Sequence, residues 1–302
     1  MDINYELYKV FYHVATTLSF SEASKKLYIS QSAVSQSIKA LEGKLSQTLF
    51  IRSTKKVRLT AEGEILLRHV EPAVSLIRRG ESRLLDSAST GGQIQIGASD
   101  TICRYFLVPY IERFHQAFPS VHIKVINATS VQCVDLLKNG QADFIVVNHP
   151  NAYLNHLWSI RSIKQFRDVF IANQSFAHLK DHPLSLAELS EYPLLMLDRR
   201  STTSEFLHSI FQRHALELVP EAELSSNDLL IDLARIGLGI AFVPDYCLKG
   251  QSESLFTVNI KETLPSRELA LVYNDKLPIS PAVAEFLNYF EPVSCQNMPE
   301  SY

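Results

Sequence analysis

The stretch SQSAVSQSIKALE, residues 30–42, carries the pattern that decides the fold of the first part of this chain. Its apolar residues recur three and four positions apart and predict one buried helix face, made of Ala33, Val34, Ile38 and Leu41. Ser30 is the natural N-cap of that helix, because its hydroxyl oxygen can accept a hydrogen bond from the first turn. The opposite face carries hydroxyl and amide groups, where charged side chains are the commoner choice.

Two further helices are predicted before this stretch. The spacing of Leu7, Val10, Phe11 and Val14 indicates one apolar helix face. The segment TTLSFS, residues 16–21, breaks that pattern, and Ser21 is predicted to cap a short second helix. Two short helices joined by a tight turn are typical of a helix-turn-helix motif.

The polar face of the third predicted helix suits the edges of DNA bases. Glutamine can pair bidentately with adenine in the major groove, and serine can donate or accept a hydrogen bond there. The free N–H groups at the start of a helix can hold a phosphate. We therefore predict DNA contacts by Ser30, Gln31, Ser32, Ser35, Gln36 and Lys39. A solvated amphipathic helix is the alternative, which would be favoured if this helix stood alone.

A basic hairpin is predicted directly after the third helix. Residues 50–51 and 57–59 indicate two short strands around RSTKK, residues 52–56. Cations at or beside its tip could grip the DNA backbone, and they are Arg52, Lys55, Lys56 and Arg58. Residues 1–60 hold nine Lys/Arg and four Asp/Glu, a net charge of +5, so the remainder carries −8 of the total −3. Only the first part is therefore expected to meet a polyanion.

A known family shares this arrangement. Residues 11–64 read FYHVATTLSFSEASKKLYISQSAVSQSIKALEGKLSQTLFIRSTKKVRLTAEGE. The stretch resembles the DNA-binding head of LysR-type transcriptional regulators, nearly continuously from residue 5 to residue 64. The resemblance implies an all-α winged helix-turn-helix that binds double-stranded promoter DNA. Gln36 is a departure, since many members carry arginine there, so their operator details are not carried over.

A long helix with an apolar stripe is predicted from residue 60 to about residue 87. Thr60 and Gly63 indicate its start, Pro72 predicts a bend, and SASTGG, residues 87–92, ends it. The stripe comprises Leu66, Leu67, Val70, Val74, Ile77, Leu84 and Leu85. Such a stripe indicates a dimer seam, with packing onto the chain's own head as the alternative. The resemblance implies the seam, and with it a homodimer or homotetramer that places paired reading helices on neighbouring half-sites.

From Gln93 onward the predicted strands and helices alternate. This order predicts parallel sheets that bind ligands at the carboxyl ends of their strands. The segments AFPSVHIKV, LLKNGQADF and IGLGIAFVP resemble the effector-binding part of LysR-type regulators, which is similar to type 2 periplasmic-binding proteins. The resemblance implies an α/β domain of two Rossmann-like subdomains with a cleft between them. Two crossings, near residues 161–166 and 264–269, would join the subdomains.

The domain boundaries follow from these patterns. The winged helix-turn-helix is predicted at residues 1–59, and the linker or dimerisation helix with its joint at residues 60–90. The effector-binding domain is predicted at residues 91–302. Within it, subdomain I comprises residues 91–163 and 267–302, and subdomain II comprises residues 164–266.

Hydroxyl residues recur where predicted strands turn into helices. A helix N-terminus with nearby hydroxyls is a ready anion site, although an N-cap role is the alternative for each residue. Asp100 would repel a simple carboxylate, whereas Arg199 and Arg200 could attract one. The effector is expected to be an organic acid, an amino acid or an inorganic anion. The predicted effector site comprises Ser99, Asp100, Thr101, Ser130, Arg200, Thr202 and Thr203.

Composition and motifs narrow the remaining possibilities. Apolar residues make up 46% of the 302 residues and charged residues 20%, as in ordinary globular proteins. No secretory signal and no apolar run of about 18 residues is seen, so a cytoplasmic protein is expected. The four cysteines, Cys103, Cys133, Cys247 and Cys295, form no C-x-x-C pair, which argues against a zinc site and a disulfide framework. A redox switch between two of them stays open.

Two other classes of function are less consistent with the sequence. An enzyme would need a catalytic motif, and no G-x-S-x-G, P-loop, H-E-x-x-H or dinucleotide fingerprint is found. A transport binding protein would need an export signal and no DNA-binding head. We therefore expect no catalytic residues, metal or cofactor. The predicted protein is a bacterial transcriptional regulator whose promoter binding is modulated by a small molecule in the C-terminal cleft.

Overall fold

The computed structural model describes residues 3–52, 57–86, 91–154, 158–248 and 254–290. The chain divides into two compact units, the first built on residues 1–85 and the second on residues 86–137 and 142–302. Each unit is considered by itself below. Within the described ranges, no helix has the length and hydropathy that crossing a lipid bilayer requires.

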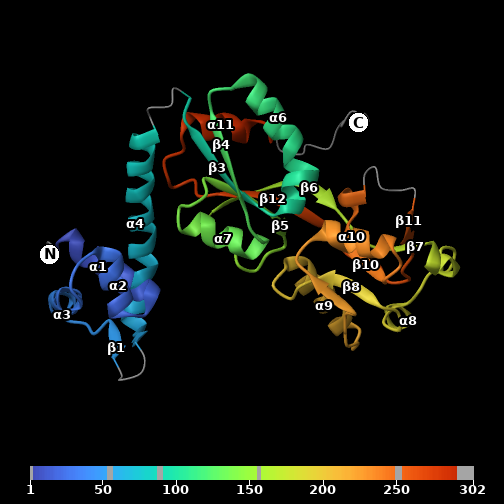
Figure 1. Cartoon of the computed structure of the whole chain (residues 1–302), viewed down its shortest axis with the longest axis horizontal. Coiled ribbons are helices and arrows are strands. Elements are labelled where there is room, and N and C mark those ends of the chain that lie inside the picture. Colours follow the sequence, from blue (N-terminus) through green and yellow to red (C-terminus); the bar gives the residue numbers. More distant parts are fainter. Residues whose placement is uncertain (1–2, 53–56, 87–90, 155–157, 249–253, 291–302) are drawn as a thin grey trace. The chain divides into compact units, whose positions relative to one another are not determined.

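Three short helices begin the first unit (Figure 1): α1 (Tyr5–Thr17), α2 (Phe20–Leu27) and α3 (Gln31–Leu45). The Ser30 hydroxyl caps α3 by accepting a hydrogen bond from Ala33 N, 3.2 Å away, as predicted. The cap predicted for α2 is wrong. Ser19, not Ser21, accepts from Glu22 N, because this start places Phe20 in the first turn, where its ring is buried.

A two-stranded wing and a long helix complete the first unit. Strand β1 (Phe50–Arg52) pairs antiparallel with β2 (Val57–Leu59), which confirms the predicted hairpin. The three helices and β1 bury one common core that includes Val14, Ile38 and Leu41. Its largest fully buried side chain is Phe11, whose ring lies 5.5 Å from that of Phe50. The Phe50 ring also lies 6.0 Å from that of Phe20, so local helix patterns and these ring contacts hold the head together.

Helix α4 (Ala61–Asp86) runs through Pro72 without ending there. The Thr60 hydroxyl accepts from Gly63 N at 3.0 Å, so Thr60 marks its start as predicted. Val70 and Val74 pack into the core of the first unit, which is the alternative considered for this helix. A second apolar row, made of Ile65, Leu76 and Ile77, stays exposed. Of the predicted stripe, Val70 and Val74 therefore pack in the head and Ile77 is exposed, while Ile65 and Leu76 lie outside the stripe as it was predicted.

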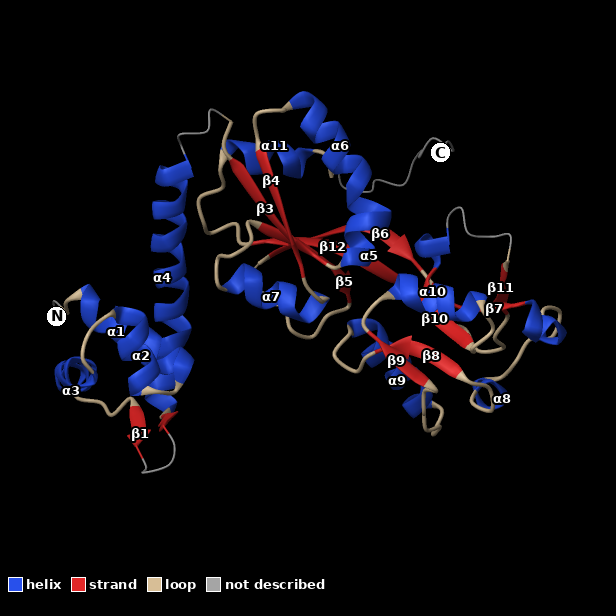
Figure 2. Ribbon diagram, viewed as in Figure 1, coloured by secondary structure: helices blue, strands red, loops and turns tan. Residues whose placement is uncertain are grey.

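The second unit contains two five-stranded sheets (Figure 2). The first has the order β4-β3-β5-β12-β6, with β3, β4 and β5 parallel and β12 antiparallel to its neighbours β5 and β6. Its strands are β3 (Gln93–Ala98), β4 (His122–Asn127), β5 (Phe144–His149), β6 (Ser159–Phe166) and β12 (Arg267–Tyr273). Its helices are α5 (Asp100–Ile102), the π-helical turn η1 (Cys103–Leu107), α6 (Val108–Ala117), α7 (Ser130–Lys138) and α11 (Pro281–Asn288).

The residues of β5 show how helices cover both faces of the first sheet. Phe144 and Val146 point into the core formed with α6 and α11, whereas Ile145 and Val147 point into the core formed with α7. Figure 2 shows α6 and α11 on one side of this sheet and α7 on the other. A strand buried on both faces reads as a continuous apolar run, as the residues FIVV of β5, 144–147, do.

The second sheet has the order β11-β7-β10-β8-β9. Its strands are β7 (Asp168–Asn173), β8 (Leu194–Leu197), β9 (Ala222–Leu224), β10 (Ile240–Pro244) and β11 (Leu255–Val258). Its helices are α8 (Leu186–Leu189), α9 (Thr202–Arg213) and α10 (Asn227–Arg235), with 3-10 turns η2 (Gln174–Leu179) and η3 (Asp245–Leu248). Helix α10 packs on the face that joins the core of the first sheet, and α9 packs on the other face.

The chain crosses between the two sheets at both predicted places. Strand β6 ends in the first sheet at Phe166, and β7 begins in the second sheet at Asp168. The return crossing leads from β11 to Arg267, the first residue of β12. Because β6 pairs with β12, the first sheet extends to Phe166, past the predicted boundary at residue 163. The crossings bring Asp168 and Arg267 together, and they lie close to the cleft described next.

Candidate functional site

A polar cleft of about 410 Å³ lies within the second unit, where the strands of both sheets end and their helices begin. One wall follows β3, β4 and β5, and the other follows β8, β9 and β10. The residues of the first wall are Ser99, Asp100, Thr101, Asn127, Ala128, Thr129, Ser130, Gln132 and Asn148. Those of the second are Leu197, Asp198, Ser201, Thr202, Thr203, Leu224, Ser225, Ser226, Asn227, Pro244 and Tyr246. The carboxyl ends of the strands thus meet at one site, as in other open α/β sheets.

Six of the seven predicted effector residues line this cleft. They are Ser99, Asp100, Thr101, Ser130, Thr202 and Thr203. The seventh, Arg200, is exposed and does not line it, and Arg199 lies 3.7 Å from the Glu223 carboxylate instead. Neither of the two arginines considered as anion ligands therefore lines the cleft.

The alternative role of these hydroxyls, as helix caps, applies to Ser99 alone. Its hydroxyl accepts from Ile102 N, whereas α7 and α9 are capped by Thr129 and Ser201. Thr101, Ser130, Thr202 and Thr203 have other partners, and each is more than nine-tenths buried. A buried hydroxyl that does not cap a helix needs another hydrogen-bonding role. These four hydroxyls are therefore the main evidence that the cleft binds a ligand.

Several hydrogen bonds cross the cleft from one wall to the other. Asn227 Nδ2 donates to Thr101 Oγ1 at 3.0 Å, and Asn148 Nδ2 donates to Thr202 Oγ1 at 3.4 Å. Beside the cleft, the Tyr105 hydroxyl donates to the Asp228 carboxylate at 2.5 Å. Neither asparagine was predicted from the sequence. A lone amide has no pattern of its own, and only the neighbouring hydroxyl pattern could have suggested it.

A buried ion pair lies behind Thr202 and Thr203. Arg267 Nη1 is 2.8 Å from Asp168 Oδ2, and the two side chains are 1% and 0% exposed. The guanidinium also donates to Thr203 Oγ1 at 3.2 Å and to Thr202 Oγ1 at 3.4 Å. Burial raises the pKa of the Asp168 carboxyl, and the Arg267 guanidinium opposes that shift by favouring the carboxylate. The pair joins both chain crossings to the first turn of α9.

The outward face of α3 presents the polar residues predicted to contact DNA. Gln31, Ser32, Gln36 and Lys39 are exposed, while Val34, Ile38 and Leu41 are buried below them. Ser30 Oγ lies 2.8 Å from Ser32 Oγ, which orders the start of the helix. Ser35 is half-buried. The backbone of Arg52 ends β1, and the predicted wing contacts Lys55 and Lys56 lie outside the described residues.

Two family models match the chain where the head and the cleft are found. A model of bacterial regulatory helix-turn-helix proteins of the lysR family matches residues 5–64. A model of the LysR substrate binding domain matches residues 87–293, more than half of the chain. The chain belongs to the LysR family. It is therefore a LysR-type DNA-binding transcriptional regulator with an effector-binding domain, and this is a family of regulators and not of enzymes.

Individual relatives agree with this assignment. The HTH-type transcriptional activator CmpR of Synechocystis is 25% identical over 285 residues, which cover 93% of each chain. Full-length CbnR complexed with its target DNA is 19% identical, with a TM-score of 0.59 over 95% of this chain and 99% of that one. The regulatory domain of CcmR from Synechocystis PCC6803, in complex with 2-PG, has 19% identity and a TM-score of 0.60 over 66% and 95%. At such identities the two structures show the shared fold alone.

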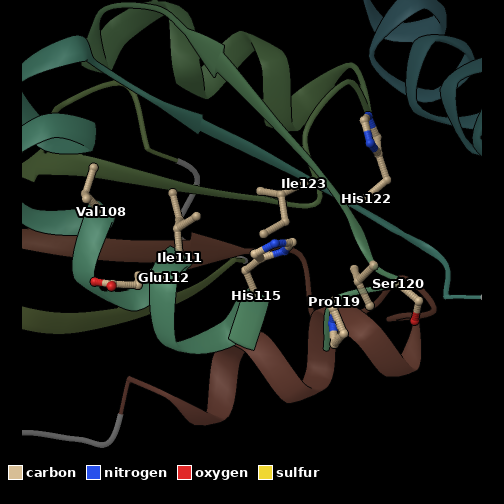
Figure 3. Close-up of a pocket in the computed structure, with 9 residues that line it drawn as sticks. Val108, Ile111, Glu112, His115, Pro119, Ser120, His122 and Ile123 are labelled. Atoms are coloured by element: carbon tan, nitrogen blue, oxygen red, sulfur yellow. The ribbon is translucent and has the colours of Figure 1, made fainter. Parts of the chain in front are cut away.

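A second hollow of this LysR-type regulator, about 570 Å³ in volume, lies between α6 and β4 (Figure 3). Ile111, His115 and Ile123 gather in it, whereas His122 points away from them. Within the described residues no group of three His, Cys, Asp or Glu side chains could hold a metal ion. The hollow is thus an apolar surface groove with polar edges, and its residues form no ligand set.

The described cysteines are free and poorly suited to redox sensing. Burial raises the pKa of Cys103 to about 11 and that of Cys133 to about 12, and it raises the pKa of Cys247 as well. Only a thiolate reacts readily with disulfide reagents. In a Cys295→Ser variant, we expect thiol labelling by 5,5′-dithiobis(2-nitrobenzoate) at pH 8 to be about a hundredfold slower than in denaturant. If one thiol of the native protein were labelled at the rate seen in denaturant, this expectation would be wrong. The hypothesis of a redox switch would then be supported.

Proposed function

We propose that the regulator reads promoter DNA with the polar face of α3 and senses a small molecule in the polar cleft. The observation that carries the first part is the set of exposed hydroxyl and amide groups on α3. These groups lie above a fully packed apolar face, so their positions are held by the core below them. Rigidly held donors and acceptors on an exposed helix are what base-edge recognition requires.

The proposed DNA contacts are Ser30, Gln31, Ser32, Ser35, Gln36 and Lys39 on the helix, with Arg52, Lys55 and Lys56 on the wing. The hydroxyl and amide side chains of the helix would read bases, and the cations, Lys39 included, would hold phosphates. The excess positive charge of residues 1–60 supports phosphate binding by the cations of this part of the chain.

The proposed effector contacts are Ser99, Asp100, Thr101, Ser130, Thr202 and Thr203. Their meeting in one cleft, with hydroxyls that mostly do not cap helices, supports this site. Hydrogen bonds already connect the two walls of the cleft. A ligand that replaces these bonds or adds to them would therefore change the relative position of the walls. Effector binding would thereby shift a population between two arrangements, and with it promoter binding.

The oligomer, the domain limits and the cellular site are part of the same proposal. The exposed row on α4, Ile65, Leu76 and Ile77, supports a seam between two copies. We propose a homodimer that pairs into a homotetramer and works in the cytoplasm. The domain limits proposed are residues 1–59, 60–90 and 91–302. The effector is an organic acid, an amino acid or an anion, and this choice is narrowed below.

The direct test is binding of purified full-length protein to DNA that flanks its own gene. Fluorescence anisotropy across about 50–200 mM salt should show affinity that falls steeply and linearly on a log–log plot, as phosphate contacts require. An unrelated duplex of equal length is the control. Binding that does not depend on salt, or that is equal for both duplexes, would overturn the assignment of α3.

Substitution of Gln36 tests the proposed reading helix. A Gln36→Ala change should relax preference at one base position by about 1–3 kcal/mol and leave the salt slope unchanged. As a matched control, Lys39→Ala should weaken binding to all sequences alike and lower the salt slope by about one. Competition against a library of single-base operator variants measures both. If Gln36→Ala weakened all sequences equally, Gln36 would be a phosphate contact instead.

A further inference from the structure

The described residues that line the polar cleft include no positively charged side chain. Lysine, arginine and histidine are all absent from these lining residues, whereas two acidic side chains, Asp100 and Asp198, are present. The nearest buried cation, Arg267, is neutralised by Asp168 behind the second wall. A ligand that carried only negative charge would therefore meet two carboxylates and no positively charged side chain among the described lining residues.

The hydroxyls of the cleft are nevertheless arranged as donors. Thr202 Oγ1 accepts from both Asn148 Nδ2 and Arg267 Nη2, so its own hydrogen remains to be donated. Thr101 Oγ1 accepts from Asn227 Nδ2, and Ser130 Oγ accepts from Asn148 N. Each oxygen already accepts at least one hydrogen bond, and no described partner receives the hydroxyl hydrogen. The cleft can thus serve a group that accepts several hydrogen bonds.

The backbone adds to these donors. Helices α7, α9 and α10 begin at Ser130, Thr202 and Asn227, which all line the cleft. The first N–H groups of a helix have no partner inside it, and the N-terminal end carries a partial positive charge. A carboxylate is one of the small anionic groups that hydroxyl hydrogens and helix N-termini can hold.

Acceptors remain beside these donors and call for a second kind of group. Asn227 is 5% exposed and lines the cleft, and its Oδ1 accepts no hydrogen bond from any described residue. Asn148 Oδ1 is also buried and accepts no hydrogen bond from any described residue. With Asp100 and Asp198, the cleft therefore offers both carboxylate and amide oxygens to a donor. An ammonium group has three donors and the charge that the two carboxylates lack.

We infer that the effector is a zwitterion of the amino-acid class, with its carboxylate on the hydroxyls and helix N-termini and its ammonium on Asp100 or Asp198. The inference rests on the proposed role of the cleft. A volume of about 410 Å³ accommodates a free amino acid with any side chain. Leu197, Leu224 and Tyr246 supply the apolar part of the lining.

The test uses the full-length protein and the twenty L-amino acids as probes. Each is paired with its 2-hydroxy acid, which lacks the ammonium, and its primary amide, which lacks the carboxylate. Thermal shift identifies binders, and calorimetry measures Kd. At least one amino acid should bind, and both of its analogues should bind at least tenfold more weakly. An Asp100→Asn/Asp198→Asn variant should weaken the amino acid at least tenfold, while Asp181→Asn, an exposed carboxylate outside the cleft, should not.

The inference is overturned if the 2-hydroxy acid, citrate or inorganic phosphate binds at least as tightly as any amino acid. It is also overturned if no amino acid binds, or if the double variant keeps the wild-type affinity for one. These results would leave the proposed function standing when the same preparation still shows salt-dependent, sequence-selective DNA binding. Loss of that DNA binding is the outcome that contradicts the proposed function instead.

Discussion

Replacing Arg267 with methionine is expected to lower the free energy of unfolding of the second unit by about 3–5 kcal/mol. The change leaves the Asp168 carboxylate buried without its cation, removes the Arg267 donor from Thr203 and leaves Thr202 with Asn148 as its donor. A loss of this size corresponds to a fall in Tm of roughly 10 °C for a unit of about 200 residues. Trp158, the one tryptophan of the chain, lies in this unit, so its fluorescence in a urea titration follows the transition.

The double variant Arg267→Met/Asp168→Leu is the control for this experiment. Removing both charges also removes the buried carboxylate, so we expect the double variant to recover most of the stability lost by the single one. A double variant no more stable than Arg267→Met would show that the pair is not the cause. If neither variant altered the tryptophan transition, the buried network between the crossings would carry no stability.

Replacing Phe11 with alanine is expected to unfold the head while leaving the second unit folded. Phe11 is fully buried against the Phe50 ring, and its loss costs about 3–5 kcal/mol in a core of this kind. A head of about 60 residues rarely has more stability than that to lose. DNA binding should therefore disappear, measured by anisotropy at 50 mM salt, while the Trp158 transition in urea stays within error of wild type.

Phe11→Leu is the matched control, because leucine fills part of the same space. It should cost roughly 1–2 kcal/mol and preserve DNA binding at low temperature. DNA binding by Phe11→Ala that equals the wild-type value would mean that the buried aromatic pair does not hold α1 to the wing. Simultaneous loss of the tryptophan transition would mean that the two units do not unfold independently.

The elements that follow local rules could be predicted closely. Helix α3 begins after Ser30 because that hydroxyl caps it, and its buried residues are those with helical spacing. Strand β5 was recognisable because it is apolar on both faces. By contrast, β6, Ser159–Phe166, was missed, since its exposed and buried residues alternate irregularly around polar side chains and it pairs only with the distant β12.

The hydroxyls of the candidate effector site could also be predicted, although their partners could not. Thr202 and Thr203 stand at a strand-to-helix turn, a place that sequence identifies. That Ser201 caps α9, and frees the two threonines, depends on where the helix begins. The predicted ligand Arg200 shows the converse: two adjacent arginines in sequence give no direction for either side chain, and both are exposed residues that do not line the cleft.

Local sequence patterns predicted the winged head and the alternation of strands and helices, because caps, helical spacing and apolar runs act over a few residues. The family was predicted from the resemblance of residues 5–64 to the LysR-type DNA-binding head. The chemistry of the cleft depends instead on contacts between residues that are distant in the sequence. Asp168 and Arg267 lie 99 residues apart, and Thr101 and Asn227 lie 126 apart, so no local pattern links them. Burial makes these pairs matter, since a charge or amide removed from water must find its partner within the fold. Residues 30–42 thus predict DNA contacts from a local pattern, whereas the residues of the cleft are brought together only by the folded sheets.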